Sequence, residues 1–97
     1  MLKTVLITGV AGFIGSNLAH NLLRRGYRVV GVDNMSQGEK ENLEPLIIND
    51  NFEMHYLDIL DQADMVRVAS NCSAIVHLAA YKIPRYTDAL DTLTINS

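Results

Sequence analysis

A glycine turn between an apolar run and an amphipathic stretch constrains the fold of this chain most. The apolar run covers residues 5–7, and Gly9, Gly12 and Gly15 follow it. A continuous apolar run of this kind is typical of a strand buried on both faces of a parallel sheet. The stretch after the glycines carries apolar residues at helical spacing. The order strand, turn and helix therefore predicts the first unit of an α/β fold.

The rest of the chain repeats this alternation. We expect strands at residues 3–8, 27–32, 52–57 and 74–79. We expect helices at residues 12–25, from about residue 42 and from residue 61, and part of a further helix from residue 88. The alternation predicts a Rossmann-type parallel sheet with strand order 3-2-1-4, helices on both faces and right-handed crossovers, truncated after the fourth strand. Residues 1–97 then form the N-terminal part of one such domain, without a substrate domain.

Several residues predict where the helices begin and end. Gly26 suits the position after the last turn of the first helix. Pro45 is tolerable only in a first turn, so we expect the second helix to begin near Asn42. Asp61 is the expected N-cap of the third helix, with Asp64 three residues further on.

Composition excludes several functional classes. The chain has 97 residues, of which 48% are hydrophobic and 20% charged, as in an ordinary soluble domain. No apolar stretch approaches the roughly 20 residues of a membrane span. The net charge is −3 and no basic cluster exceeds Arg24-Arg25, so we expect no nucleic-acid partner. The single cysteine, Cys72, excludes an intrachain disulfide and fits a cytoplasmic location. His20 and His55 lack metal-ligand spacing, so we expect no metal.

The spacing of the glycines predicts a site for a dinucleotide pyrophosphate. Gly9 permits the tight turn, Gly12 lets the backbone approach the phosphates, and Gly15 lets the helix pack closely on the strand. Backbone N–H groups and the positive end of the helix dipole then face the anion. No Lys-Ser or Lys-Thr pair follows, which disfavours a nucleoside-triphosphate loop. The alternative is a glycine-rich turn that only packs.

Asp33 supports the dinucleotide interpretation. It ends the second expected strand, 18 residues after Gly15, near the roughly 20 expected for the acid that accepts hydrogen bonds from the adenosine ribose. A carboxylate there repels a 2′-phosphate, and no Arg occurs within the five residues that follow. NAD is therefore favoured over NADP. The alternative for Asp33 is a solvated turn residue.

Together these motifs make the chain resemble the nucleotide-sugar epimerase/dehydratase family, the extended short-chain dehydrogenases. The resemblance covers all 97 residues, which correspond to the N-terminal part of such an enzyme. The second motif is particularly similar to UDP-glucose 4-epimerases and UDP-glucuronate epimerases or decarboxylases. The matching motifs are Thr8-Gly9-x-x-Gly12-Phe13-Ile14-Gly15, Asp33-Asn34-x-Ser36-x-Gly38-x-x-x-Asn42-Leu43, Asp58-Ile59 and His77-Leu78-Ala79-Ala80.

The resemblance implies NAD as cofactor and assigns roles on its adenosine side. Phe13 and Ile14 lie on the pyrophosphate turn. Asp33 and Asn34 hold the ribose. The remaining expected contacts to the adenosine side are Ser36 and Gly38 near the ribose, and Asp58 and Ile59 at the adenine. The alternative for Asp58 is a cap of the following turn.

The resemblance also implies contacts near the end of the fourth strand. Leu78, Ala79 and Ala80 line the cofactor there, although small residues also suit plain packing. Lys82 matches a cofactor-proximal lysine of some members, yet Lys82 and Arg85 equally suit a solvated loop. Asn96 matches an asparagine that approaches the cofactor, although many members have Val where this chain has Ser97. His77 is interpreted as a strand-end residue rather than a catalytic one.

The family's reaction, transient oxidation of a UDP- or dTDP-sugar by bound NAD, needs a Ser or Thr and a Tyr-x-x-x-Lys pair. None of the four tyrosines has Lys four positions later, and Tyr81-x-x-x-Arg85 contains a proline. We therefore expect an N-terminal fragment that binds but does not catalyse. Two functions stay open: the NAD-binding portion of a nucleotide-sugar epimerase or dehydratase, and a non-catalytic NAD or adenine-nucleotide binding module. We expect a homodimeric parent enzyme. We also expect that the fragment self-associates through its exposed fourth strand or is only marginally stable.

Overall fold

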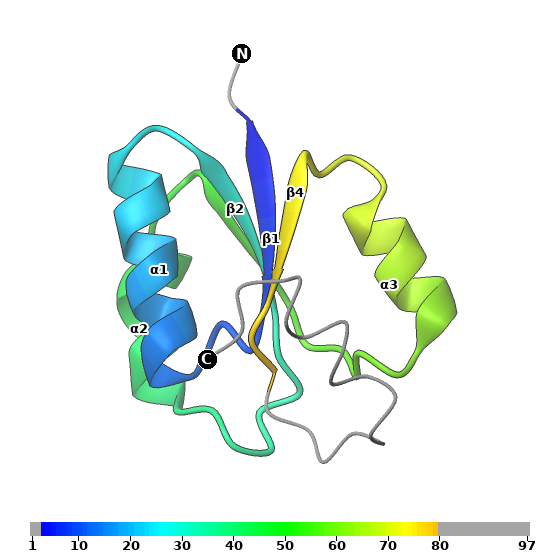
Figure 1. The fold of residues 1–97 in the computed structure, drawn as a ribbon. Coiled ribbons are helices and arrows are strands. Elements are labelled where there is room, and N and C mark those ends of the chain that lie inside the picture. The colour runs from blue at the N-terminus through cyan, green and yellow to red at the C-terminus, as the bar shows by residue number, and fades with distance from the viewer. Residues whose placement is uncertain (1–2, 80–97) are drawn as a thin grey trace.

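The computed structural model describes residues 3–79, which form one parallel sheet between two layers of helices (Figure 1). The strands lie in the order β3-β2-β1-β4, and every neighbouring pair is parallel. This confirms the predicted Rossmann-type order 3-2-1-4. The strands are β1 (Thr4–Thr8), β2 (Arg28–Val32), β3 (Phe52–His55) and β4 (Ala74–His77). The helices are α1 (Phe13–Arg24), α2 (Lys40–Ile47) and α3 (Gln62–Ala69).

The two central strands, β1 and β2, are buried on both faces, as their apolar sequences predict. Helices α1 and α2 cover one face, and α3 covers the other (Figure 1). Val5 and Ile7 of β1 belong to the core beneath α1 and α2, whereas Leu6 belongs to the core beneath α3. Successive strand residues point to opposite faces, so an unbroken apolar run serves both cores.

Two of the expected helix ends are confirmed. Gly26, at φ +91°, follows the C-cap of α1. Its N–H donates to the carbonyl of Leu23 at 3.1 Å, and the N–H of Tyr27 donates to the carbonyl of Leu22 at 3.0 Å. This pair of bonds is the Schellman motif. At α3, Oδ1 of Asp61 accepts from the backbone N–H of Asp64 at 3.2 Å, as expected of an N-cap.

The predicted start of the second helix is wrong. Helix α2 begins at Lys40, so Pro45 lies in its second turn and leaves the carbonyl of Glu41 without its usual intrahelical donor. The helix tolerates this interruption because Leu43 and Leu46 are buried in the core on either side of the proline. Packing of an apolar face outweighs local propensity in a short helix.

The third and fourth strands are shorter than predicted. β3 ends at His55, which pairs with the last residue of β2, and β4 ends at His77, which pairs with Thr8. Each strand ends where its neighbour in the sheet turns away, because a ladder needs a partner. The expected helix from residue 88 lies outside the described residues.

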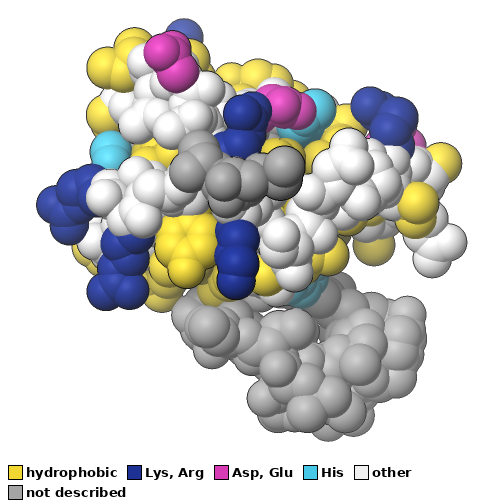
Figure 2. Space-filling view, turned by 90° about the horizontal axis from the view of Figure 1, so that it is seen from above, with side chains coloured by type: hydrophobic (Ala, Val, Ile, Leu, Met, Phe, Trp, Pro, Cys, Tyr) yellow, Lys and Arg dark blue, Asp and Glu magenta, His cyan; other side chains and the backbone are white. Residues whose placement is uncertain are grey.

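The surface at the N-terminal ends of the strands has no single charge character. Figure 2 shows this end of the molecule, where Lys and Arg side chains are spread among acidic, hydrophobic and uncharged ones. Among residues 3–79, no helix is long and apolar enough to cross a membrane. The pocket described next lies at the opposite end of the sheet.

Candidate functional site

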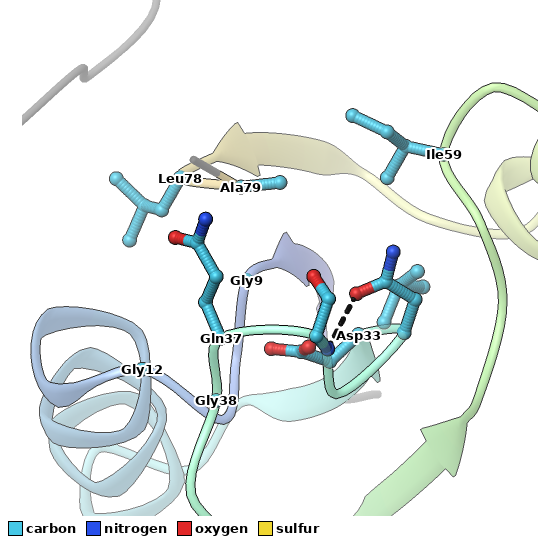
Figure 3. A pocket seen from close by; sticks show the side chains of 11 residues that line it. Gly9, Gly12, Asp33, Gln37, Gly38, Ile59, Leu78 and Ala79 are labelled. Atoms are coloured by element: carbon cyan, nitrogen blue, oxygen red, sulfur yellow. Dashed lines mark hydrogen bonds between the residues drawn. The ribbon is translucent and has the colours of Figure 1, made fainter. Parts of the chain in front are cut away.

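A pocket of about 130 Å³ lies at the carboxyl ends of β1, β2 and β4. This is the edge where the strand order reverses, and open α/β sheets bind ligands there. Figure 3 shows the pocket with the glycine turn on one side and the loop between β2 and α2 on another. Nine predicted residues line it: Gly9, Gly12, Asp33, Asn34, Ser36, Gly38, Ile59, Leu78 and Ala79.

Each of the three glycines in the turn has a different structural role. Gly9 has φ +74°, and a Cβ there would lie 2.8 Å from the backbone nitrogen of Ala79. A Cβ on Gly15 would collide with the carbonyl oxygen of Gly9, so this glycine lets α1 approach the turn. A Cβ on Gly12 would meet only that same oxygen, at 3.3 Å, and otherwise open space. Gly12 thus leaves room on the pocket side, as the spacing predicts.

The hydroxyl of Thr8 joins the turn to the end of β4. This fully buried residue accepts hydrogen bonds at Oγ1 from the N–H groups of Leu78 at 3.0 Å and Ala79 at 3.3 Å. Its Oγ1 also lies 2.8 Å from Nδ1 of His77. The N–H of Leu78 also donates to the backbone carbonyl of Thr8 at 3.1 Å. Thr8 therefore holds the strand end that carries two pocket residues.

The carboxylate of Asp33 is buried at the pocket and bonded to backbone on both sides. Oδ2 accepts from the N–H of Ala11 in the glycine turn at 2.9 Å, and Oδ1 accepts from the N–H of Met35 at 2.7 Å. With 8% of its surface exposed, Asp33 is not the solvated turn residue of the alternative interpretation. Each oxygen retains further acceptor capacity.

The loop after Asp33 and the end of β4 close the remaining sides. Oδ1 of Asn34 accepts from the N–H of Ser36 at 2.9 Å, which shapes this loop. Two residues that the sequence reasoning missed also line the pocket, Val32 and Gln37. The side chain of Gln37 extends toward Leu78 and Ala79 (Figure 3). Its position between two motif residues, Ser36 and Gly38, was the signal that could have indicated it.

Four predicted residues lie elsewhere among residues 3–79. Phe13, Ile14 and Gly15 line an adjacent hollow on the other side of the turn, which Gly9, Gly12 and Leu78 share. Asp58 does not line the main pocket, and its Oδ1 accepts from the N–H of Leu60 at 2.9 Å. That bond is the turn cap of the alternative interpretation. Ala80, Lys82, Arg85 and Asn96 lie outside the described residues.

The thiol of Cys72 lies outside the main pocket. Burial raises the pKa of the Cys72 thiol, and the negative charge of Glu53 raises this pKa further. A thiol with a raised pKa stays protonated and is a poor nucleophile. Between residues 3 and 79, no group of three His, Cys, Asp or Glu side chains is placed to hold a metal ion.

Comparison with known proteins identifies the family. A family model described as GDP-mannose 4,6 dehydratase matches residues 6–96. The UDP-glucose 4-epimerase of Mycolicibacterium smegmatis is 46% identical over 77 residues, which cover 77% of this chain and 24% of that enzyme. The chain spans about a quarter of the length of the curated relatives it matches.

Solved structures agree with this match. The enzyme WbmH of Bordetella bronchiseptica, in complex with NAD+, has a TM-score of 0.75 and 38% identity, covering 97% of this chain and 31% of that one. The UDP-glucose 4-epimerase of Thermotoga maritima, solved with UDP-glucose, has a TM-score of 0.71 and 33% identity, covering 94% and 28%. Because the family model matches nearly the whole chain and two of these relatives are UDP-glucose 4-epimerases, the chain belongs to the GDP-mannose 4,6-dehydratase family of nucleotide-sugar epimerases and dehydratases.

Proposed function

We propose that residues 1–97 form the N-terminal, NAD-binding part of a nucleotide-sugar epimerase or dehydratase. The observation that carries this proposal is the pocket itself, which brings together the glycine turn, the buried carboxylate of Asp33 and the end of β4. The NAD+ complex of WbmH, which is similar over nearly the whole of this chain, supports the choice of cofactor.

The first turn of α1 suits the pyrophosphate. Its N-cap is Gly12, no side chain caps it, and no acidic residue lies in the turn. The N–H groups of Phe13, Ile14 and Gly15 have no partner within the helix, because the first turn of any helix leaves such groups over. These donors and the positive end of the dipole favour an anion.

Asp33 suits the adenosine ribose, because its carboxylate reaches the pocket and retains acceptor capacity. Asn34, Ser36 and Gly38 would lie beside the ribose, and Ile59 would contact the adenine. Asp58, which precedes Ile59 but does not line the pocket, is proposed to contact the adenine as well. No Lys or Arg lines the pocket within residues 3–79, and nothing there would offset the repulsion of a 2′-phosphate by Asp33. NAD is therefore preferred to NADP.

We also propose the remaining cofactor contacts that the family resemblance implies. Leu78 and Ala79 would line the cofactor at the end of β4, and we assign Ala80, Lys82 and Asn96 to the same side. Bound NAD would accept a hydride and return it, and the residues of this chain would bind and orient the cofactor. The substrate class is a nucleotide sugar, as in the Thermotoga epimerase solved with UDP-glucose.

A non-catalytic NAD or adenine-nucleotide binding module is the second candidate. It is favoured by one observation: no tyrosine in these 97 residues has Lys four positions later. The gene beyond codon 97 separates the two functions. A Ser or Thr followed by Tyr-x-x-x-Lys supports the enzyme, and a stop codon supports the module.

We infer a cytoplasmic location from the single cysteine, and a homodimer for the parent enzyme. We also infer that the 97-residue chain self-associates. β4 lies at one edge of the described sheet, and Ala74 and Ile75 are exposed along it. An apolar edge strand with free backbone groups favours pairing with another chain.

Calorimetric titration of the 97-residue chain with NAD, ADP-ribose and NADP tests the proposed cofactor. NAD and ADP-ribose should bind with similar and weak affinity, because most of the assigned residues in the described pocket belong to the adenosine side and the pyrophosphate. NADP should bind at least tenfold more weakly, since a 2′-phosphate beside a buried carboxylate is repelled. Failure of both NAD and ADP-ribose to bind contradicts the proposal. Tight NAD binding that depends on the nicotinamide contradicts the assignment of the pocket.

A further inference from the structure

The backbone of Ala11, in the middle of the glycine turn, is held by the segment between β2 and α2 and by the first turn of α2. Its N–H donates to Oδ2 of Asp33 at 2.9 Å. Its carbonyl oxygen accepts from the N–H of Glu39 at 3.0 Å and from Nδ2 of Asn42 at 2.8 Å. Ala11 is fully buried, so these three bonds replace water on both of its polar groups.

We propose that Asn42 is a positioning residue for dinucleotide binding. Its side-chain amide holds the carbonyl of Ala11 and so determines the orientation of the glycine turn. Asn42 does not itself line either hollow at the turn. This inference rests on the proposed NAD-binding function. Asn42 belongs to the motif that begins at Asp33, and it is not among the residues proposed to contact the cofactor.

The bond from Asn42 acts on one particular peptide group. The carbonyl of Ala11 and the N–H of Gly12 belong to the same planar unit, and the N–H of Gly12 donates to the carbonyl of Gly9 at 3.1 Å. The unit is thereby held at both ends. Gly12 is the N-cap of α1, so the orientation of this unit determines where the first N–H groups of α1 point. Those groups are the proposed pyrophosphate donors.

Helix α2 gives Asn42 a rigid base. Asn42 is the third residue of α2, and its neighbour Leu43 is fully buried in the core together with Leu46. The amide therefore reaches the turn from a packed element rather than from a mobile loop. Removal of the amide leaves the carbonyl of Ala11 its second donor, the N–H of Glu39. The fold should thus survive the change while the turn loses one constraint.

The test compares binding of ADP-ribose to the wild-type chain and to Asn42→Ala. Calorimetry is carried out where circular dichroism shows both proteins folded. The dissociation constant should rise about fivefold, the equivalent of one ordinary hydrogen bond. Asn42→Gln, which keeps the amide donor, should recover most of the affinity. Asn21→Ala is the matched control, because Asn21 is an exposed residue of α1 whose amide oxygen accepts from Arg24.

A purely structural role would lower the melting temperature and leave the affinity of the folded protein unchanged. Unchanged affinity in folded Asn42→Ala, or no recovery in Asn42→Gln, overturns the inference. Should Asn42→Ala fail to fold, the side-chain amide signal of Asn42 in wild-type NMR spectra decides: it should shift when ADP-ribose binds, and a fixed signal overturns the inference. Wild-type protein that binds neither NAD nor ADP-ribose contradicts the proposed function, and this inference with it.

Discussion

At the pocket, both oxygens of the Asp33 carboxylate accept hydrogen bonds from the protein backbone. It accepts one backbone N–H from the glycine turn and one from the loop that follows β2. The second of these donors is Met35, whose φ of +66° is unusual for a residue other than glycine. Asp33 therefore stabilises a strained loop and the turn together. The proposed ribose contact adds to this role.

Asp33→Ala should weaken binding of both NAD and ADP-ribose at least tenfold, because it removes the proposed ribose acceptors and leaves the N–H groups of Ala11 and Met35 without their partner. The same change should lower the free energy of unfolding by about 1–3 kcal/mol. Calorimetry measures the first effect and chemical denaturation the second. Asp50→Ala removes an equal charge from an exposed position and is the control. Unaltered affinity in Asp33→Ala would overturn the assignment of this residue.

Individual residues of the site were predictable where a motif fixes their distance along the chain from a strand end. Asp33 lies in the pocket because the residue after a parallel strand reaches the carboxyl edge of the sheet. Asp58 follows a strand that ends three residues earlier, at His55, so its place depends on a turn that spacing does not describe. Contacts between distant segments, such as Asn42 with Ala11, depend on packing, which spacing along the chain does not specify.

At the scale of elements, periodicity predicted every strand and helix within residues 3–79 but not every boundary. The order of the sheet follows from the alternation of strands and helices, because parallel connections have one hand. The positions where strands and helices end depend instead on contacts with neighbouring elements. β4 stops at His77 since β1 ends opposite it, at Thr8. Helix α2 continues through Pro45 since its apolar side is buried.

A substitution of Pro45 tests whether packing of the apolar side of α2 offsets the unfavourable helix propensity of proline. Pro45→Ala should restore a donor for the carbonyl of Glu41 and remove the clash of the proline ring, so α2 should become more stable. We expect the melting temperature to rise by about 4 °C or more, because interior proline is the least favourable helix residue. Thermal unfolding followed by circular dichroism measures the change. Glu44→Ala, at the preceding exposed position, is the control. A lower melting temperature would show that proline stabilises the protein by reducing the conformational entropy of the unfolded chain, and that this effect exceeds its cost within α2.

At the scale of the whole molecule, β4 both forms an edge of the described sheet and leads into residues that line the pocket. The sheet order places β4 beyond β1, and the end of β4 supplies Leu78 and Ala79 to the pocket. The buried hydroxyl of Thr8 bonds to both of those residues. A partner chain that paired with β4 would therefore lie close to the proposed cofactor. Self-association and ligand binding are expected to influence each other in this chain.

Ile75→Lys should shift the 97-residue chain toward monomer. Ile75 is 50% exposed on β4, and a lysine on an edge strand opposes pairing with a second chain through its charge and its hydration. Sedimentation velocity at several protein concentrations measures the effect, and the wild type should sediment faster as concentration rises. Ile48→Lys makes the same substitution at an 82% exposed position just after α2, away from β4, and should leave the association unchanged. A wild-type chain that stays monomeric at all concentrations contradicts the prediction, and equal effects of the two lysines would place the contact elsewhere.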